Sequence, residues 1–84
     1  MPISTVVSDP RVKDVRFTDE NLEVVLRDGR KISVPVSWFP RLASASHEDR
    51  LVWELSAAGH GVHWPLIDED LSVEGLLRGE VGVN

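Results

Sequence analysis

Residues 22–36 read LEVVLRDGRKISVPV, and this stretch decides the fold. Aliphatic residues alternate with other residues on both sides of Asp28-Gly29, which is the period of a half-buried strand. Because Asp-Gly tolerates the two positive φ angles of a type I′ turn, the stretch predicts an antiparallel hairpin. Val25 interrupts the polar face of the first strand, which indicates that its back is partly covered. Pro35 has no N–H to donate, so the second strand ends there or lies at a sheet edge.

A further strand is predicted before this hairpin. Over residues 11–18 the period of two places Lys13, Val15 and Phe17 on one face. The sequence Thr-Asp-Glu-Asn at residues 18–21 is typical of a turn. The N-terminal part of the chain is therefore expected to form a three-stranded antiparallel meander.

A short helix is expected directly after the meander. Ser37 is placed to cap a helix that carries Trp38, Phe39 and Leu42. Pro40 falls in its first turn, where a missing N–H costs least. The helix is expected to stop soon afterwards, at a Ser-Ala-Ser sequence.

Ser46 is predicted to cap a second helix, which opens with His47-Glu48-Asp49. The two carboxylates suit the positive end of the helix dipole. Helical spacing of the apolar residues continues to Ala58, and Gly59 is a suitable residue just beyond the end. Periodicity alone therefore favours one helix over residues 47–58.

An alternative ends that helix near Leu51 and makes residues 52–56 a strand. A turn at residues 57–61 would then pair it with a strand at residues 62–64. This version uses both glycines as turn residues. It also accounts for Trp53, which would lie off the apolar stripe of the single helix. The residues by themselves leave the two versions open.

The C-terminal part is expected to contain one more helix. Ser72 can cap it, and Gly79 can end it. Residues 1–10 are interpreted as a loose lead-in and residues 80–84 as a frayed tail, which leaves a single domain over residues 11–79. The predicted class is α+β, with an antiparallel β-meander followed by short helices, a second hairpin and a short C-terminal helix.

The composition limits the functions open to the chain. Its 84 residues can build one hydrophobic core and little more. The absence of cysteine removes disulfides and thiolate chemistry, and it fits a reducing compartment, so we expect a cytoplasmic protein. No leader or long apolar run is present, so we expect no membrane association. A core this small also leaves self-association as a homodimer open as an alternative.

The charge balance favours a protein partner. Nine Lys and Arg oppose fourteen Asp and Glu, for a net charge of −5. An acidic chain opposes phosphate binding, so nucleic acid is not expected as the partner, and a small basic protein fits better. A basic strand face is still predicted at Arg11, Lys13, Arg16, Arg27, Arg30 and Lys31.

The residues best suited to chemistry are Asp68, Glu69 and Asp70, near His60 and His63. Carboxylates and imidazoles are common metal ligands, and a histidine beside a carboxylate can act as a general base. The spacing fits no known ligand pattern, however, and no nucleophile is arranged with His63. We therefore expect no metal, no cofactor and no catalysis, and we expect the carboxylates to cap the last helix and to pair with a nearby arginine such as Arg41 or Arg50.

The aromatic residues are first interpreted as core filler. Trp and Phe side chains bury about 150–250 Å² each, which a small domain needs. Tryptophan is also frequent at binding hot spots. We expect at most one of the three tryptophans to be spare for that purpose, and Trp38, in the corner near the sheet edge, is the candidate.

Two segments carry a resemblance to a known family. Residues 53–77, WELSAAGHGVHWPLIDEDLSVEGLL, and residues 36–42, VSWFPRL, resemble the bacterial domain-of-unknown-function family 2442. The likeness extends over the Asp28-Gly29 hairpin, from about residue 12 to residue 77. It implies a small α+β domain with an antiparallel sheet, and it favours the strand at residues 52–56.

The resemblance implies little about activity. Some relatives carry this domain before a helix-turn-helix module, for which this chain has no residues left, and others lie beside a small companion gene in arrangements similar to toxin–antitoxin pairs. We therefore expect a non-enzymatic protein-interaction module, the regulatory or antitoxin-like member of a two-gene pair. The alternative is a nucleic-acid-associated regulatory domain that uses the basic strand face. The predicted partner-binding residues are Trp38, Arg41, His63, Asp68, Glu69 and Asp70.

Overall fold

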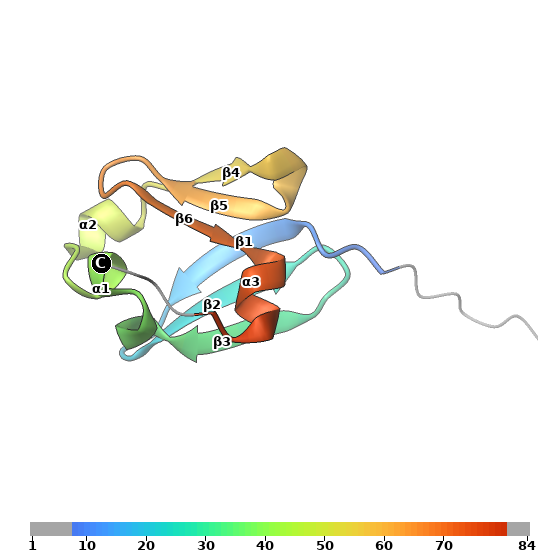
Figure 1. Ribbon diagram of the computed structural model, residues 1–84, viewed down its shortest axis with the longest axis horizontal. Coiled ribbons are helices and arrows are strands. Elements are labelled where there is room, and N and C mark those ends of the chain that lie inside the picture. The colour runs from blue at the N-terminus through green and yellow to red at the C-terminus, as the bar shows by residue number, and fades with distance from the viewer. Residues whose placement is uncertain (1–7, 81–84) are drawn as a thin grey trace, which may run out of the picture.

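Two three-stranded antiparallel sheets lie one against the other in the computed structural model, which describes residues 8–80 (Figure 1). The first sheet consists of β1 (Val12–Phe17), β2 (Asn21–Leu26) and β3 (Lys31–Pro35), in that order. The second consists of β4 (Glu54–Ser56), β5 (Gly61–Trp64) and β6 (Glu69–Ser72). The predicted α+β class, with its meander and second sheet, is confirmed.

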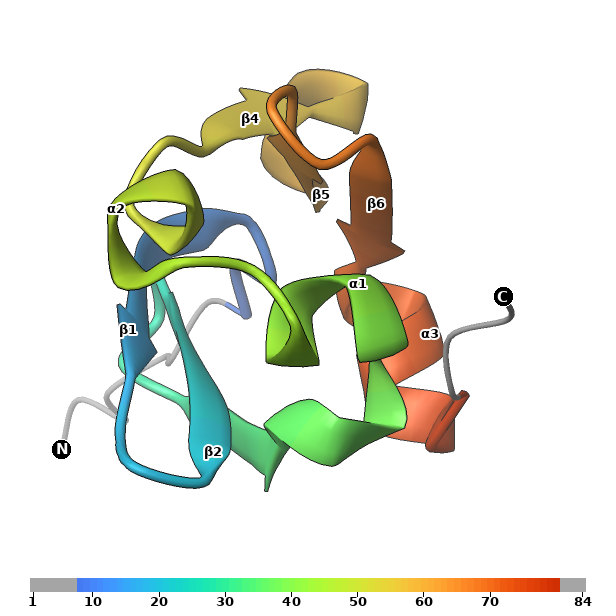
Figure 2. The same ribbon diagram turned by 90° about the vertical axis from the view of Figure 1, so that its left-hand side faces the viewer.

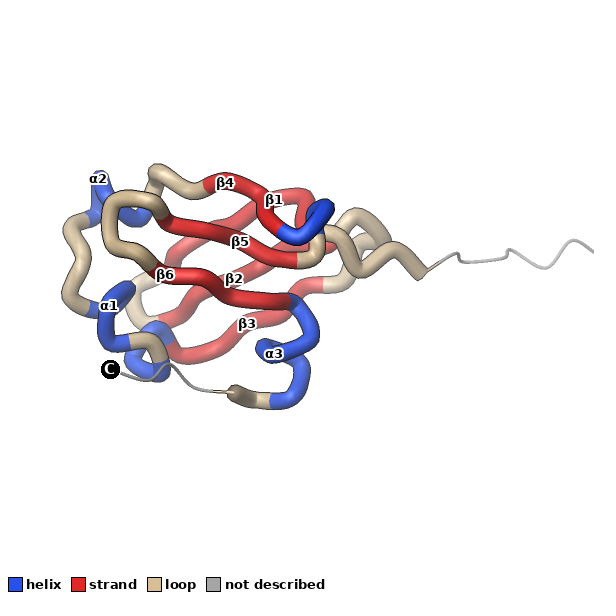
Figure 3. Tube along the Cα trace, turned by 45° about the horizontal axis from the view of Figure 1, so that its top comes forward, coloured by secondary structure: helices blue, strands red, loops and turns tan. Residues whose placement is uncertain are grey.

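The helical segments are short. They are η1 (Val36–Trp38), α1 (Pro40–Ala43), α2 (His47–Arg50), η2 (Ala57–Gly59) and α3 (Val73–Arg78). Figure 3 shows α1 and α2 at one end of the molecule, whereas α3 follows β6 and lies beside β3. No helix within residues 8–80 is long and apolar enough to cross a bilayer. Residues 1–7 of the predicted lead-in and 81–84 of the predicted tail lie outside the described residues.

The hairpin of β2 and β3 is confirmed, but its turn is not the expected type I′. Of Asp28 and Gly29, only Gly29 has a positive φ, of 95°, whereas a type I′ turn needs two. Its N–H donates to the carbonyl of Leu26 at 3.1 Å, so the loop is a three-residue connection with glycine in the left-handed position. Asp28 instead uses its carboxylate to accept hydrogen bonds from the backbone N–H groups of Asp9 and Arg30. As predicted, β3 is an edge strand that ends at Pro35.

A bulge in β1 changes the expected strand face. Val12 lies opposite Leu26 and Asp14 opposite Val25, so Lys13 is an extra residue in the ladder. The bulge lets Val12 and Val15 both point into the core, and Lys13 is exposed. The prediction that Lys13 shares a face with Val15 is therefore wrong. Val25 is 9% exposed, which confirms that the back of β2 is covered.

The helix caps are partly as expected. The Ser46 hydroxyl accepts the Asp49 N–H at 3.1 Å, and the Ser72 hydroxyl accepts the Gly75 N–H at 2.9 Å. Gly79 ends α3 with a φ of 77°. Ser37 does not cap a helix, because it lies inside η1, and α1 begins after Phe39 without a side-chain cap.

The strand version is correct in kind, although β4 covers only Glu54–Ser56 of the predicted residues 52–56, and the second sheet has one more strand than expected. The helix that Ser46 opens ends at Arg50, and β4 pairs with β5. Residues 69–72, expected to be part of an acidic cap, form β6 against β5. The prediction that Asp68, Glu69 and Asp70 cap α3 is wrong, because Ser72 alone supplies that hydrogen bond.

One hydrophobic core fills the space between the sheets. Trp64 and Leu42 are fully buried, and Phe39 is 2% exposed. Phe17, Trp38 and Trp53 pack half-buried against this core, so all five large aromatics contribute to it. The rest of the core comes from β1, β2, β3, η1, β5 and α3: Val12, Val15, Leu22, Val24, Leu26, Val34, Val36, Val62, Val73 and Leu76.

Candidate partner-binding surface

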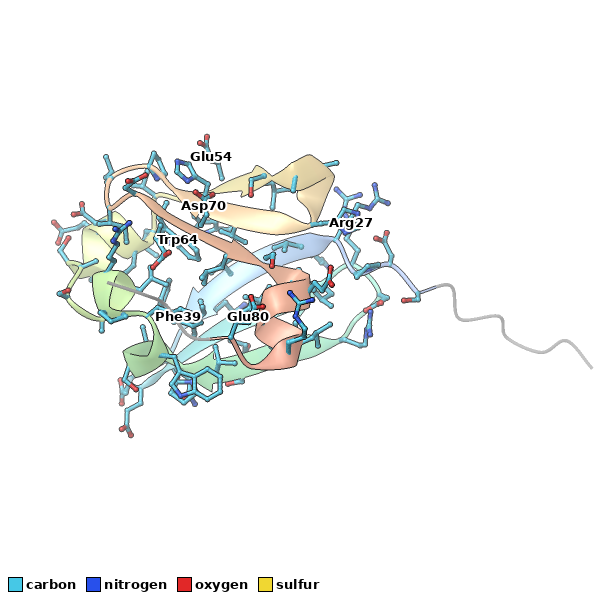
Figure 4. The ribbon with its side chains drawn as sticks, in the orientation of Figure 1. Arg27, Phe39, Glu54, Trp64, Asp70 and Glu80 are labelled. Atoms are coloured by element: carbon cyan, nitrogen blue, oxygen red, sulfur yellow. The ribbon has the colours of Figure 1, made fainter. Side chains whose placement is uncertain are left out.

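The register of the second sheet sorts its side chains into rows. In the order β4, β5 and β6 the rows are Glu54, His63 and Asp70; Leu55, Val62 and Leu71; and Ser56, Gly61 and Ser72. Directly opposite residues share a face, and Val62 is 1% exposed, so the aliphatic row faces the core. The row of Glu54 therefore faces outward. Figure 4 shows Glu54 and Asp70 outside the sheet and Trp64 inside it.

The outward row places an imidazole between two carboxylates. His63 Nδ1 lies 3.0 Å from Asp70 Oδ1, while Glu54 lies opposite His63 on the other neighbouring strand. The Asp70 side chain is 67% exposed and the His63 side chain 27%, so water reaches the carboxylate more freely than the imidazole. Within residues 8–80 no three His, Asp or Glu side chains gather closely enough to hold a metal ion.

Arg41 joins α1 to the turn between β5 and β6. Its Nη1 donates to the Asp68 carbonyl oxygen at 2.5 Å and lies 3.9 Å from Asp68 Oδ2. The expected pairing of this acidic stretch with Arg41 is thus present. Asp68 has a φ of 52°, in the left-handed region that aspartate tolerates in turns.

Exposed aliphatic side chains lie on the segment that leads from α2 into β4, the outermost strand of the second sheet. Leu51, Val52 and Leu55 are 58%, 46% and 43% exposed, and all three lie between the end of α2 and the middle of β4. Leu66, in the turn after β5, is also exposed. β4 is the outermost strand of its sheet (Figure 3), which leaves the side chain of Leu55 partly uncovered.

Arg50, the one basic residue of this segment, is turned toward the protein. Its Nε donates to the Leu42 carbonyl at 2.9 Å and its Nη2 to the Ala43 carbonyl at 3.1 Å. Its guanidinium lies 5.2 Å from the centre of the Phe17 ring. The Trp64 indole N–H donates to the Arg50 carbonyl at 3.0 Å, which fastens the end of α2 to β5.

The carboxylates around the exposed aliphatics are left without a cationic partner. Among residues 8–80, Glu48, Asp49 and Glu54 form no ion pair, since the available arginine contacts backbone oxygens instead. The result is an acidic edge that also exposes aliphatic side chains, with Glu54 and Asp70 on the outer face and Leu55 on the core side, and we call it the β4 surface. It consists of Glu48, Asp49, Leu51, Val52, Glu54, Leu55 and Asp70.

The arginines of the first sheet, by contrast, are neutralised locally. Arg11, Arg16 and Arg30 each pair with an aspartate two residues earlier, at 2.8, 3.0 and 2.8 Å. The hydrogen bond from the Arg11 side chain lowers the pKa of Asp9 to about 2. The corresponding bond from Arg30 lowers the pKa of Asp28. Half of the predicted basic face is therefore already occupied by carboxylates.

The predicted partner-binding residues fall in separate places. His63 and Asp70 contact each other on the outer face of the second sheet, and Arg41 meets Asp68 at its end. Glu69 lies opposite Trp64 at the start of β6, and its carboxylate accepts the Asp70 N–H. Trp38 belongs to η1, which lies beside the first sheet, away from the outer face of the second (Figure 2).

Sequence reasoning missed Glu54 and the aliphatic edge. A signal was present, because Leu51, Val52 and Leu55 are large apolar residues between charged ones. Under the helical reading they formed a stripe that a core would cover, and under the strand reading their exposure depended on which strands paired. Recognising β6 would have aligned Glu54, His63 and Asp70 in one row.

Comparison with known proteins places the chain in a family without a described activity. The model of the family described as "Protein of unknown function (DUF2442)" matches residues 12–82. A crystal structure of a protein of unknown function from Rhodospirillum rubrum is 29% identical, with a TM-score of 0.75, over 92% of this chain and 95% of that one.

A second solved structure shows the same fold. It is the solution NMR structure of the uncharacterised protein CV0863 from Chromobacterium violaceum, which is 24% identical, with a TM-score of 0.74, over 87% of this chain and 69% of that one. No curated protein matches the chain. Because the family model spans both sheets, the chain belongs to the DUF2442 family, whose members are proteins of unknown function.

Proposed function

We propose that this chain is a non-enzymatic interaction module that binds a small basic protein through the β4 surface. The observation that carries the proposal is the coincidence of exposed aliphatics with unpaired carboxylates on one segment, from Glu48 to Leu55, while Arg50 is turned inward. In the cell, the partner would be the product of the neighbouring gene, with this chain as the regulatory or antitoxin-like member of the pair.

The physical logic is that of a small interface. Apolar side chains at its centre supply the favourable burial, and charges around them provide specificity and speed of association. The net charge of −5 attracts a basic partner over a longer range than the contacts themselves. Scattered exposed leucines need no explanation, but here Leu51, Val52 and Leu55 are neighbours on one segment.

The polar row of the second sheet supports binding rather than catalysis. Among the described residues the His63 ring forms its hydrogen bond with Asp70, and no serine hydroxyl joins them. A general base needs a proton to abstract within hydrogen-bond reach. A half-buried imidazole beside an exposed carboxylate on the outer face of a sheet is better suited to hydrogen-bonding a partner's side chains.

The test is co-purification from cells that co-express the chain with its neighbouring gene. The wild type and the control Asp19→Lys/Glu20→Lys are expected to retain the partner, whereas Glu54→Lys/Asp70→Lys should lose most of it. Both variants change the net charge equally, and Asp19 and Glu20 lie in the exposed turn between β1 and β2. Recovery of a lone wild-type chain at every expression level, or equal retention by both variants, would overturn the proposal.

The alternative is a nucleic-acid-associated domain that uses the first sheet. It is supported by Lys13, Arg27 and Lys31, which are exposed and form no ion pair among residues 8–80. Phosphate binding would release counterions, so affinity would fall steeply as salt is added. Absence of binding to duplex DNA or RNA at low salt would remove this alternative.

A further inference from the structure

We propose that the partner binds by adding a strand to the free edge of β4, and that this strand alternates basic and aliphatic side chains. This inference rests on the proposed function and specifies its binding mode. It follows from the pairing of β4, from the rows of the second sheet and from the charges around the edge.

The edge of β4 is open for pairing. In the order β4-β5-β6, β4 pairs on one side only, with β5. A strand in this position presents backbone N–H and C=O groups along its other side, which a further strand can satisfy. Figure 1 shows β4 at the margin of the sandwich with no element of the described chain beyond it.

The cross-strand rows of the second sheet indicate which side chains the added strand needs. A residue next to Leu55 would extend the row Leu55, Val62 and Leu71, so an aliphatic side chain fits there and covers a leucine that is 43% exposed. A residue next to Glu54 would extend the row that continues into His63 and Asp70, so a lysine or arginine fits there. Because adjacent residues of a strand face opposite sides, the added strand alternates the two kinds.

The other edges are less suited to pairing. β3 ends in Pro35 and carries the exposed Lys31, and both features oppose the docking of another strand. β1 contains the bulge at Lys13, which interrupts a regular ladder. At β6, Arg41 already occupies the Asp68 carbonyl next to the start of the strand.

A second copy of this chain is a poor occupant of the same edge. Pairing two β4 strands would bring together Glu48, Asp49 and Glu54 of both chains. Arg50 offers no compensation, because its guanidinium donates to the carbonyls of Leu42 and Ala43. Like charges at an interface oppose association, so the charge pattern selects a basic strand over a copy of the chain.

Hydrogen exchange with a designed peptide tests this binding mode. The probe is a seven-residue peptide of alternating lysine and valine, and a peptide of the same composition with its lysines and valines in separate blocks is the control. The alternating peptide is expected to bind more tightly and to slow exchange of the amides of residues 52–56, with no change in β3. Glu54→Lys should weaken this binding roughly tenfold, whereas Glu20→Lys should change it less than twofold.

Each outcome bears on the inference. Binding of the alternating peptide with slowed exchange at residues 52–56 supports edge pairing. If both peptides bind equally, or if neither slows exchange there, edge pairing is wrong. Edge pairing can fail while the proposed function holds: this is the outcome if a partner still co-purifies and loses affinity on Glu54→Lys/Asp70→Lys. If no partner co-purifies either, both edge pairing and the proposed function are wrong. Slowed exchange that depends on protein concentration without peptide would show a second copy at the edge instead.

Discussion

Arg50 makes the β4 surface acidic, because its guanidinium is turned toward the protein. Two of its N–H groups bind the carbonyls of Leu42 and Ala43, and its guanidinium stacks on Phe17. Phe17 in turn meets Trp64 edge-on, with ring centres 6.3 Å apart. The same contacts hold α2 against the sandwich and withdraw a positive charge from the acidic surface.

Arg50→Lys tests this role through stability. A lysine keeps the charge but cannot donate to two carbonyls in a fixed plane while stacking on Phe17, so we expect a loss of about 1–2 kcal/mol in the free energy of unfolding. Urea denaturation followed by tryptophan fluorescence measures it. Arg78→Lys, on the exposed face of α3, is the control and should cost clearly less, because solvent screens its ion pairs. Equal losses for both variants would show that the Arg50 contacts stabilise the fold no more than those of an exposed arginine.

Asp9 makes a pH-dependent contribution to stability. The hydrogen bond from the Arg11 side chain lowers its pKa to about 2 in the folded protein, against about 3.9 in an unfolded chain. The contribution is therefore complete above about pH 5 and is lost as the pH falls toward 2. The stability difference between wild type and Asp9→Asn should be constant from about pH 5 to 7 and shrink between about pH 4 and 2. Urea titrations across this range measure it, and a difference independent of pH would contradict the role of the ion pair.

At the scale of elements, the link between β4 and β5 has an unusual backbone. Ala57 and Ala58 have φ values of 50° and 56°, in the left-handed region that L-residues with a Cβ avoid. Gly59 continues with a φ of 93°, and a Cβ there would lie 3.2 Å from the Arg11 side chain. The turn that presents β4 is thus held in place despite two unfavourable residues.

Ala58→Gly is expected to stabilise the protein. Ala58 is exposed, so no packing is lost, and glycine adopts its conformation without the Cβ penalty. We expect a gain of about 0.5–1 kcal/mol. Ala43→Gly in α1 is the matched control and should lose a similar amount, because α1 has ordinary helical geometry. Thermal denaturation measures both, and a loss in Ala58→Gly would contradict the left-handed assignment.

The elements that could be predicted are those whose signals are local. The hairpin around Gly29 and the caps at Ser46 and Ser72 depend on a few neighbouring residues, and all three are present. β6 was missed because its sequence, EDLS, has one aliphatic residue and two acids, which by themselves indicate a polar loop. Its strand conformation comes from pairing with β5, a tertiary effect that local propensity cannot supply.

The candidate site was predictable only in part for the same reason. The pairing of Asp68 with Arg41 was expected, because an acidic stretch in a small domain attracts a nearby arginine. The β4 surface was not expected, since Leu51, Val52 and Leu55 resemble core residues until the pairing of β4 is known. Their exposure results from the position of β4 at the end of the second sheet.

At the scale of the whole molecule, the sandwich separates two kinds of surface. The first sheet and the residues flanking its strands carry Arg11, Arg16, Arg27 and Arg30, three of which are bound to aspartates two residues earlier in the chain. The segment from α2 to β4 carries the exposed aliphatics Leu51, Val52 and Leu55, and among residues 8–80 its carboxylates Glu48, Asp49 and Glu54 form no ion pair. Because exposed charges are screened by salt, the complex with a basic partner should weaken as salt increases, while the aliphatic contacts keep part of the affinity.

That salt dependence can be measured by isothermal titration calorimetry. Between about 50 mM and 500 mM NaCl we expect the affinity of the wild-type complex to fall roughly tenfold, and the affinity of Glu54→Lys/Asp70→Lys, already lower, to change much less. An affinity that rises with salt in the wild type would show that aliphatic burial alone drives binding and that the carboxylates have no role.

The most direct test of the account is a map of the partner's footprint. Amide shifts of the ¹⁵N-labelled chain, recorded with and without the co-purified neighbouring gene product, are expected to change over residues 48–56 and at His63 and Asp70. The first sheet, including Lys13, Arg27 and Lys31, should keep its free-state shifts. A footprint confined to the first sheet, with residues 48–56 unchanged, would contradict the claim that the β4 surface is the binding site.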